Sequence, residues 1–166
     1  MQKVSLTLAA HKDKALAIAL DYALDKDQHI TLKREEKITK AISGKECFII
    51  HADSRPVGFV IFDYRFFDQG WIELIIIDEN ERGKGIAGRV FDLICNQCTS
   101  EKVFTSTNQS NLPMQRALVK SGFTFAGKLD GLDEGDPELF YYRKTETAGT
   151  AIPDNCNESK SGNEVR

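Results

Sequence analysis

The chain has 166 residues, of which 41% are hydrophobic and 28% charged, and its formal net charge is −3. This length and composition predict one globular domain and exclude a multidomain protein. Because 22 basic residues face 25 acidic ones, no basic surplus exists to neutralise nucleic-acid phosphates, and we expect no nucleic-acid partner.

The first half of the chain predicts a strand, two helices and three further strands. A strand is expected within Lys3–Ala10, followed by a helix over Lys14–Leu24, where apolar residues recur every three or four positions. A second helix follows Thr31, a suitable N-cap residue. Short apolar runs between turn residues then predict an antiparallel meander of three strands, at Cys47–Ile50, Val57–Phe62 and Trp71–Ile77.

The second half predicts helices alternating with strands, and then a closing strand pair. Proline begins one of these helices, where its missing N–H is harmless, and Gly122 ends it. The predicted fold class is therefore α/β, a mixed and mostly antiparallel twisted sheet of six to seven strands with helices on both faces. The elements are helices at about Gly85–Gln97 and Pro113–Lys120, and strands at Val103–Thr107, Phe123–Ala126 and Leu139–Arg143.

Composition changes after Lys144. From Thr145 to Arg166, the only large apolar residues are Ile152 and Val165, so this tail is expected to be disordered. We therefore predict a folded domain over residues 1–144 and a disordered tail over residues 145–166.

Membrane, disulfide and metal sites are not expected. No apolar run approaches the roughly 18 to 20 residues that cross a bilayer, so we expect no membrane partner. The cysteines are too few and too unevenly placed to form a disulfide framework, which indicates a reducing, cytoplasmic location. The CxxC segment lacks a second pair and the histidines lack ligand spacing, so no metal is expected. These residues are Cys47, Cys95, Cys98 and Cys156, and His11, His29 and His51.

The most informative segment joins a strand to a helix through glycines. An apolar run ends at Ile77, and five polar residues later Gly83 and Gly85 precede the predicted helix. Unpaired backbone N–H groups at the positive end of a helix form an anion site. Glycines allow a diphosphate to approach the backbone because they lack a Cβ atom.

Two other phosphate-binding motifs have to be weighed at the same place. Gly83, Gly85 and Gly88 match the dinucleotide-binding pattern G-x-G-x-x-G. The five polar residues before the first glycine, and the lack of an acidic residue ending the next strand about 20 positions later, argue against that fold. A Walker loop is excluded because Lys84 is followed by glycine instead of Ser or Thr.

Two spaced motifs follow one another in the second half of the chain. Arg82 is followed three residues later by Gly85, and Ala87 comes two residues after that. Asn111 stands eleven residues before Gly122-Phe123. In this order the two motifs resemble those of the GNAT superfamily of acetyl-CoA-dependent N-acetyltransferases, whose coenzyme motif is Arg or Gln, two residues, Gly, one residue, and Gly or Ala. The resemblance covers about residues 3 to 144, although the first half matches only in its order of elements.

The resemblance implies a three-layer α/β/α GNAT-like fold that binds acetyl-CoA as a co-substrate. The fourth strand would separate from the fifth, so that the pantetheine of coenzyme A inserts between them. Asn111 would contact pantetheine or orient a loop. In the alternative interpretation, Arg82 and Lys84 are solvated and Asn111 only caps a helix. Ile75 and Ile77 would offer backbone groups, and the diphosphate would be wrapped by the backbone amides of Arg82, Gly83, Lys84, Gly85, Ile86 and Ala87.

Attack of an amine on a thioester needs a neutral nucleophile and a donor to the developing oxyanion. The backbone N–H of Ile75 is the oxyanion donor that we expect in such a site. Glu73 lies on the same strand, and alternation predicts that it shares a face with Ile75 and Ile77. Glu73 is therefore our candidate for the general base, and the alternative is a half-exposed residue in a surface ion pair.

The general acid is left open. Many family members carry a tyrosine four residues before the glycine of the Gly-Phe pair, and here Leu118 occupies that position. Water could replace the tyrosine, or no acid is needed. The side chains considered as substitutes are Ser121, Tyr64, Tyr141 and Tyr142.

An acidic loop follows the second motif. Asp130–Glu138 holds five carboxylates in nine residues, and in this fold the loop before the last strand borders the acceptor site. We therefore hypothesise a cationic amine acceptor, with a solvated hairpin as the alternative.

Together these features predict an N-acetyltransferase that moves an acetyl group from acetyl-CoA to a primary amine by direct attack in a ternary complex. The rival interpretation is a non-catalytic acyl-CoA-binding sensor or protein-interaction module of the same fold, which Leu118 favours. The sequence does not decide the acceptor's identity, and a homodimer stays open.

Overall fold

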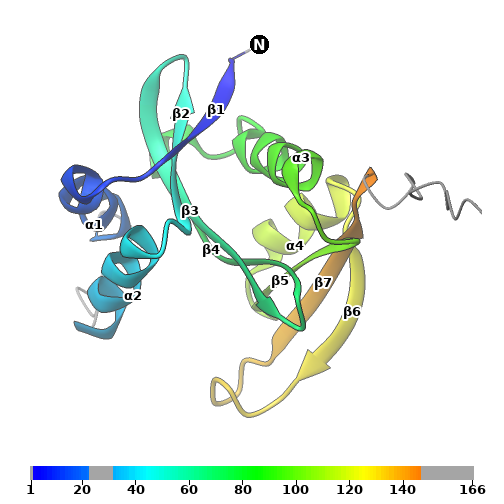
Figure 1. Cartoon of the computed structure of the whole chain (residues 1–166). Coiled ribbons are helices and arrows are strands. Elements are labelled where there is room, and N and C mark those ends of the chain that lie inside the picture. Colours follow the sequence, from blue (N-terminus) through cyan, green and yellow to red (C-terminus); the bar gives the residue numbers. More distant parts are fainter. Residues whose placement is uncertain (1, 23–31, 147–166) are drawn as a thin grey trace, which may run out of the picture.

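The computed structural model describes residues 2–22 and 32–146. Several predictions lie outside these residues. They concern the last two residues of the Lys14–Leu24 helix, the N-cap residue Thr31, His29, Cys156 and the tail from residue 147. The elements follow the predicted order (Figure 1). They are β1 (Val4–Leu8), η1 (His11–Asp13), α1 (Lys14–Tyr22), α2 (Leu32–Ser43), β2 (Cys47–Ala52), β3 (Arg55–Phe66), β4 (Gln69–Ile77), η2 (Glu79–Glu81), α3 (Ile86–Gln97), β5 (Lys102–Asn108), α4 (Leu112–Lys120), β6 (Thr124–Leu129) and β7 (Glu138–Lys144).

The strands form one seven-stranded sheet in the order β1-β2-β3-β4-β5-β7-β6. All neighbours are antiparallel except β4 and β5, which are parallel and pair only where Gly70–Ile72 meets Val103–Thr105. Thr105 donates its hydroxyl hydrogen to the Ile72 carbonyl at 3.0 Å where this pairing ends. Beyond that point β4 continues along β3 but leaves β5, so the sheet is forked. The predicted mixed, mostly antiparallel sheet is confirmed.

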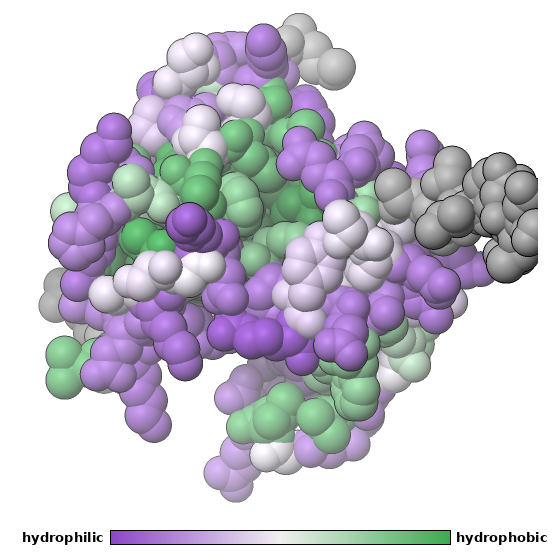
Figure 2. Space-filling view, viewed as in Figure 1, coloured by the Kyte–Doolittle hydropathy of each residue, from purple (hydrophilic) through white to green (hydrophobic). Residues whose placement is uncertain are grey.

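Helices cover both faces of the sheet, as predicted. One hydrophobic core lies under α1 and α2 and contains Ala17, Ile38 and Ile42. The other lies under α3 and α4 and contains Val90, Leu118 and partners from six strands of the sheet. Figure 1 places the two helix pairs on opposite sides, and Figure 2 shows hydrophobic residues between α1 and α3 with hydrophilic residues around them.

A β-bulge in β4 overturns one prediction about the site. Ile61 of β3 pairs with Leu74 while Phe62 pairs with Ile72, so Glu73 is one extra residue on β4. The extra residue interrupts the alternation of side chains. Ile75 and Ile77 pack towards α3, whereas Leu74 packs into the core under α2.

Glu73 also lies on the α2 side of the sheet, because its carboxylate forms an ion pair with Lys37 of that helix. The prediction that Glu73 shares a face with Ile75 and Ile77 is therefore wrong. Strict alternation holds only for a strand that carries no extra residue.

The folded part continues past residue 144. Thr145 is buried, and it donates its backbone N–H to Glu101 and its hydroxyl hydrogen to the Ser100 carbonyl, at 3.0 and 2.6 Å. In the part of the chain described here, no helix is long and apolar enough to span a membrane.

Candidate functional site

The turn between β4 and α3 leaves the start of that helix open. Asp78 accepts a hydrogen bond from the backbone N–H of Asn80 at 2.9 Å and so begins the η2 turn. Gly83 and Gly85 then adopt φ values of +76° and +74°, which residues with a Cβ atom rarely adopt. The N-cap residue of α3 is Gly85, which has no side chain, and no side chain of the described residues caps the helix in its place, so its first N–H groups stay available to an anion.

A cleft of about 950 Å³ lies beside this turn and holds most of the predicted binding residues. Lys84 does not line it, because its Nζ atom forms an ion pair with Glu81 at 3.1 Å. Arg82 does, and its Nε atom donates to the Ile77 carbonyl at 3.2 Å. The predicted residues that line the cleft are Ile75, Ile77, Arg82, Gly83, Gly85, Ile86, Ala87 and Asn111.

The cleft is more basic than the sequence motifs suggested. Besides Arg82, it is lined by Arg89 of α3, Arg116 and Lys120 of α4, and Arg143 of β7. These residues are far apart in the chain and belong to no motif, so only the fold brings them together. The cleft is thus lined by five basic residues and by two acidic ones, Glu81 and Asp92. This excess of positive charge fits a polyanionic ligand.

Arg89 provides a specific sign of a missing partner. Its Nη2 atom donates to the Lys84 carbonyl at 3.0 Å, but its Nε atom is buried without a hydrogen-bond partner in the described structure. A buried donor without an acceptor is unfavourable. A phosphate oxygen in the cleft could satisfy this donor.

Glu81 anchors the base of the glycine turn. Its buried carboxylate accepts hydrogen bonds from Arg55 of β3 and from Lys84. The hydrogen bond from Arg55, followed by that from Lys84, lowers the pKa of Glu81 to about 2. Glu81 is therefore ionised at neutral pH and ties the turn to the start of β3.

Asn111 has the helix-capping role that was given above as its alternative. Its side-chain oxygen accepts a hydrogen bond from the Met114 backbone N–H at 3.3 Å, which caps α4. The same residue also lines the cleft.

Of the side chains considered for the general acid, only Ser121 lines the cleft. Leu118 is fully buried in the core under α3 and α4. The Tyr64 hydroxyl accepts a hydrogen bond from the Thr99 backbone N–H at 3.1 Å, and Tyr141 is buried in the core.

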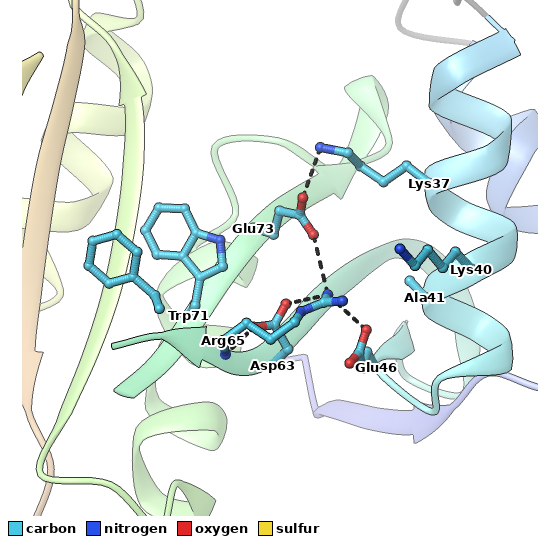
Figure 3. Close-up of a pocket in the computed structure, with 9 residues that line it drawn as sticks. Lys37, Lys40, Ala41, Glu46, Asp63, Arg65, Trp71 and Glu73 are labelled. Carbon is cyan, nitrogen blue, oxygen red and sulfur yellow. Dashed lines mark hydrogen bonds and ion pairs between the residues drawn. The ribbon is translucent and has the colours of Figure 1, made fainter. Parts of the chain in front are cut away.

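A second, smaller pocket lies on the other face of β4, and we call it the Glu73 pocket (Figure 3). Glu73 forms an ion pair with Lys37 at 2.9 Å, and Arg65 approaches it at 4.0 Å. The ion pair named above as the alternative role of Glu73 is thus present, and the carboxylate also borders a pocket of about 360 Å³. The lining residues are Lys37, Lys40, Ala41, Glu46, Asp63, Arg65, Phe66, Trp71 and Glu73.

The fork of the sheet lies between the two sites. Ile72 is the last residue of β4 that pairs with β5, and Glu73 follows it directly. Glu73 and Ile75 are two residues apart in the chain, and their side chains lie on opposite faces of β4.

The acidic loop is partly engaged in local structure. Asp133 accepts a hydrogen bond from Asn108, and Asp136 accepts two from Ser110, through its backbone N–H and its hydroxyl. These carboxylates hold the loop against the end of β5. Glu134 makes no such contact among the described residues.

Comparison with known proteins relates the whole fold to one family. The model of the acetyltransferase (GNAT) family matches residues 14–123. A GNAT-family acetyltransferase from Bacillus cereus is 30% identical, with 86% of this chain and 98% of that chain covered and a TM-score of 0.76. A GNAT-family acetyltransferase from Streptococcus agalactiae is 20% identical, with 86% of this chain and 96% of that chain covered and a TM-score of 0.69. The protein yncA from Salmonella typhimurium, solved with its cofactor acetyl-CoA, is 15% identical, with 92% and 99% covered and a TM-score of 0.66. A search of curated proteins gave no match.

Proposed function

Because the chain belongs to the acetyltransferase (GNAT) family, we propose that it transfers an acetyl group from acetyl-CoA to a primary amine in a ternary complex. The fork between β4 and β5 carries this proposal. It has a basic cleft with an open helix start on one face and a carboxylate in a pocket on the other.

We assign the larger cleft to acetyl-CoA, which supplies an acyl group activated as a thioester. The open N–H groups at the start of α3, together with Arg82 and Arg89, would hold the diphosphate. Ile75 and Ile77 would contact the pantetheine through their backbone, and the Ile75 N–H would donate to the developing oxyanion. The bound acetyl-CoA of yncA supports this assignment by fold likeness.

Glu73 is the general base of the proposed reaction. Its carboxylate accepts a proton from the acceptor's ammonium group, which leaves a neutral amine. The amine nitrogen then forms a bond with the thioester carbon while the carbon–sulfur bond breaks. The departing thiolate takes a proton from water or from Ser121, and the second proton lost by the nitrogen as the amide forms returns to that same water or Ser121.

Release of free thiol from acetyl-CoA with a panel of primary amines tests the proposal. Glu73→Gln should lower kcat/KM about 100-fold, with acetyl-CoA affinity unchanged in calorimetry. Glu36→Gln is the matched control, because Glu36 lies on α2 and does not line the Glu73 pocket. Acetyl-CoA binding without thiol release for any amine would contradict the proposal and favour the sensor module, which the buried Leu118 in the tyrosine position also favours.

A further inference from the structure

We infer that the acceptor is a zwitterionic amino acid with an aromatic side chain, held in the Glu73 pocket. This inference rests on the proposed function, because it assigns the pocket to the acceptor amine. It follows from the charges that line the pocket, the aromatic wall beside them and the position of Glu73 at the fork.

Three acidic and three basic residues line the pocket, and one of the basic residues forms no ion pair among the described residues. Arg65 forms ion pairs with Asp63 and Glu46 at 2.7 and 2.9 Å, and Lys37 pairs with Glu73. Lys40 is the remaining charged residue, and its Nζ atom has no ion-pair partner among the described residues. Figure 3 shows Lys40 extending from α2 towards the pocket, on the side where Arg65 and Glu46 lie. An acceptor that carries a carboxylate would give this ammonium group a partner.

The amine end of the acceptor has a separate place. Glu73 lies directly beyond the last residue pair between β4 and β5, whereas Lys40 projects from the helix that covers the pocket. An ammonium group at Glu73 would take the position that Lys37 now holds. The two ends of a zwitterion thus match two different, oppositely charged parts of one pocket.

Aromatic rings form the third part of the pocket. Phe66 and Trp71 line it and stack with ring centroids 4.7 Å apart. Phe66 also contacts Phe104 and Phe140, with centroids at 5.2 and 6.0 Å, and these three rings line an adjoining hollow of about 380 Å³. In Figure 1, α1 and α2 lie over the β1–β4 part of this face, and no other helix of the described residues lies over β5, β6 and β7 on this side. An aromatic side chain of the acceptor would stack on this wall.

Three acceptors separate the features of the ligand: L-phenylalanine, 2-phenylethylamine, which lacks the carboxylate, and L-alanine, which lacks the ring. In the thiol-release assay, kcat/KM for phenylalanine should exceed that for each of the other two at least tenfold. Lys40→Gln should lower kcat/KM for phenylalanine about tenfold and that for phenylethylamine less than twofold. Lys33→Gln removes a positive charge from the same helix outside the pocket and should change neither value.

Each outcome decides the inference. Equal turnover of phenylalanine and phenylethylamine, or of phenylalanine and alanine, would overturn it while leaving the acetyltransferase proposal intact. If Lys40→Gln lowered kcat/KM equally for phenylalanine and for phenylethylamine, that result would also overturn it. Calorimetric titration of phenylalanine into the protein with bound CoA gives a second readout, in which Lys40→Gln should weaken binding about tenfold. Thiol release with another primary amine of the panel but with none of these three would overturn the inference alone, whereas release with no amine of the panel would overturn both proposals.

Discussion

Replacement of Gly85 by alanine tests the glycine turn as an anion site. Gly85 has a φ of +74°, and a Cβ atom built there meets nothing nearer than Arg89 Nη1, at 3.9 Å. The substitution therefore costs no steric clash within the protein, and its cost is that of a left-handed residue, about 1–2 kcal/mol of unfolding free energy. Gly131 is the matched control, because its φ is +88° and nothing lies within 4 Å of its added Cβ.

The two variants should differ only in ligand binding. Gly131→Ala should lose the same 1–2 kcal/mol in urea unfolding and bind acetyl-CoA normally. Gly85→Ala puts a methyl group in the cleft and disturbs the first N–H groups of α3. Loss of one charge-assisted hydrogen bond, about 1.5–3 kcal/mol, corresponds to a Kd about 10- to 150-fold higher in calorimetry. A Kd within twofold of the unchanged protein would refute the assignment of the diphosphate to this turn.

Three further substitutions test other parts of the structure. Leu118→Ala should lower the unfolding free energy by about 2–5 kcal/mol, because the side chain is fully buried; a loss below about 1 kcal/mol in urea titration would contradict its place in the core. Glu81 has a pKa lowered from 4.5 to about 2, so its stabilising contribution is present above pH 4.5 and disappears as the pH falls towards 2. The unfolding free energy of Glu81→Gln should therefore be lower than that of the unchanged chain at pH 7 and nearly equal to it at pH 2. A difference that does not change with pH would argue against the ion pairs of Glu81. Glu134→Lys should raise the KM of an ammonium acceptor, more at low salt than at high salt, and a KM that is the same at both would remove the acidic loop from acceptor attraction.

The order of elements and the glycine turn were predictable because they depend on local chemistry. Apolar spacing marks the buried face of a helix, and glycines before a helix start leave its first N–H groups without a side-chain cap. The two motifs containing Arg82 and Asn111 then placed nearly all of the predicted binding residues on one cleft.

The bulge in β4, the basic lining of the cleft and the lining of the Glu73 pocket depend instead on contacts between segments that are distant in the chain. No pattern in the chain marks the extra residue at Glu73, since a bulge is defined by the register of two paired strands. Arg143 and Arg89 come to the same cleft from β7 and α3, and Lys40 and Trp71 line one pocket only because α2 packs on that face of the sheet. The side chain of Lys84, whose backbone amide is predicted at the diphosphate, forms an ion pair with the buried carboxylate of Glu81, and no motif predicts that contact.

The bulge in β4 also bears on the order of events during turnover. Because Ile75 and Glu73 face opposite sides of the strand, each reactant of the proposed reaction would have its own entrance, and occupancy of one would not obstruct the other. The two products would likewise leave through separate exits, in either order. Initial-rate measurements at varied concentrations of both reactants should therefore give intersecting double-reciprocal lines, since parallel lines would require the first product to leave before the second reactant arrives.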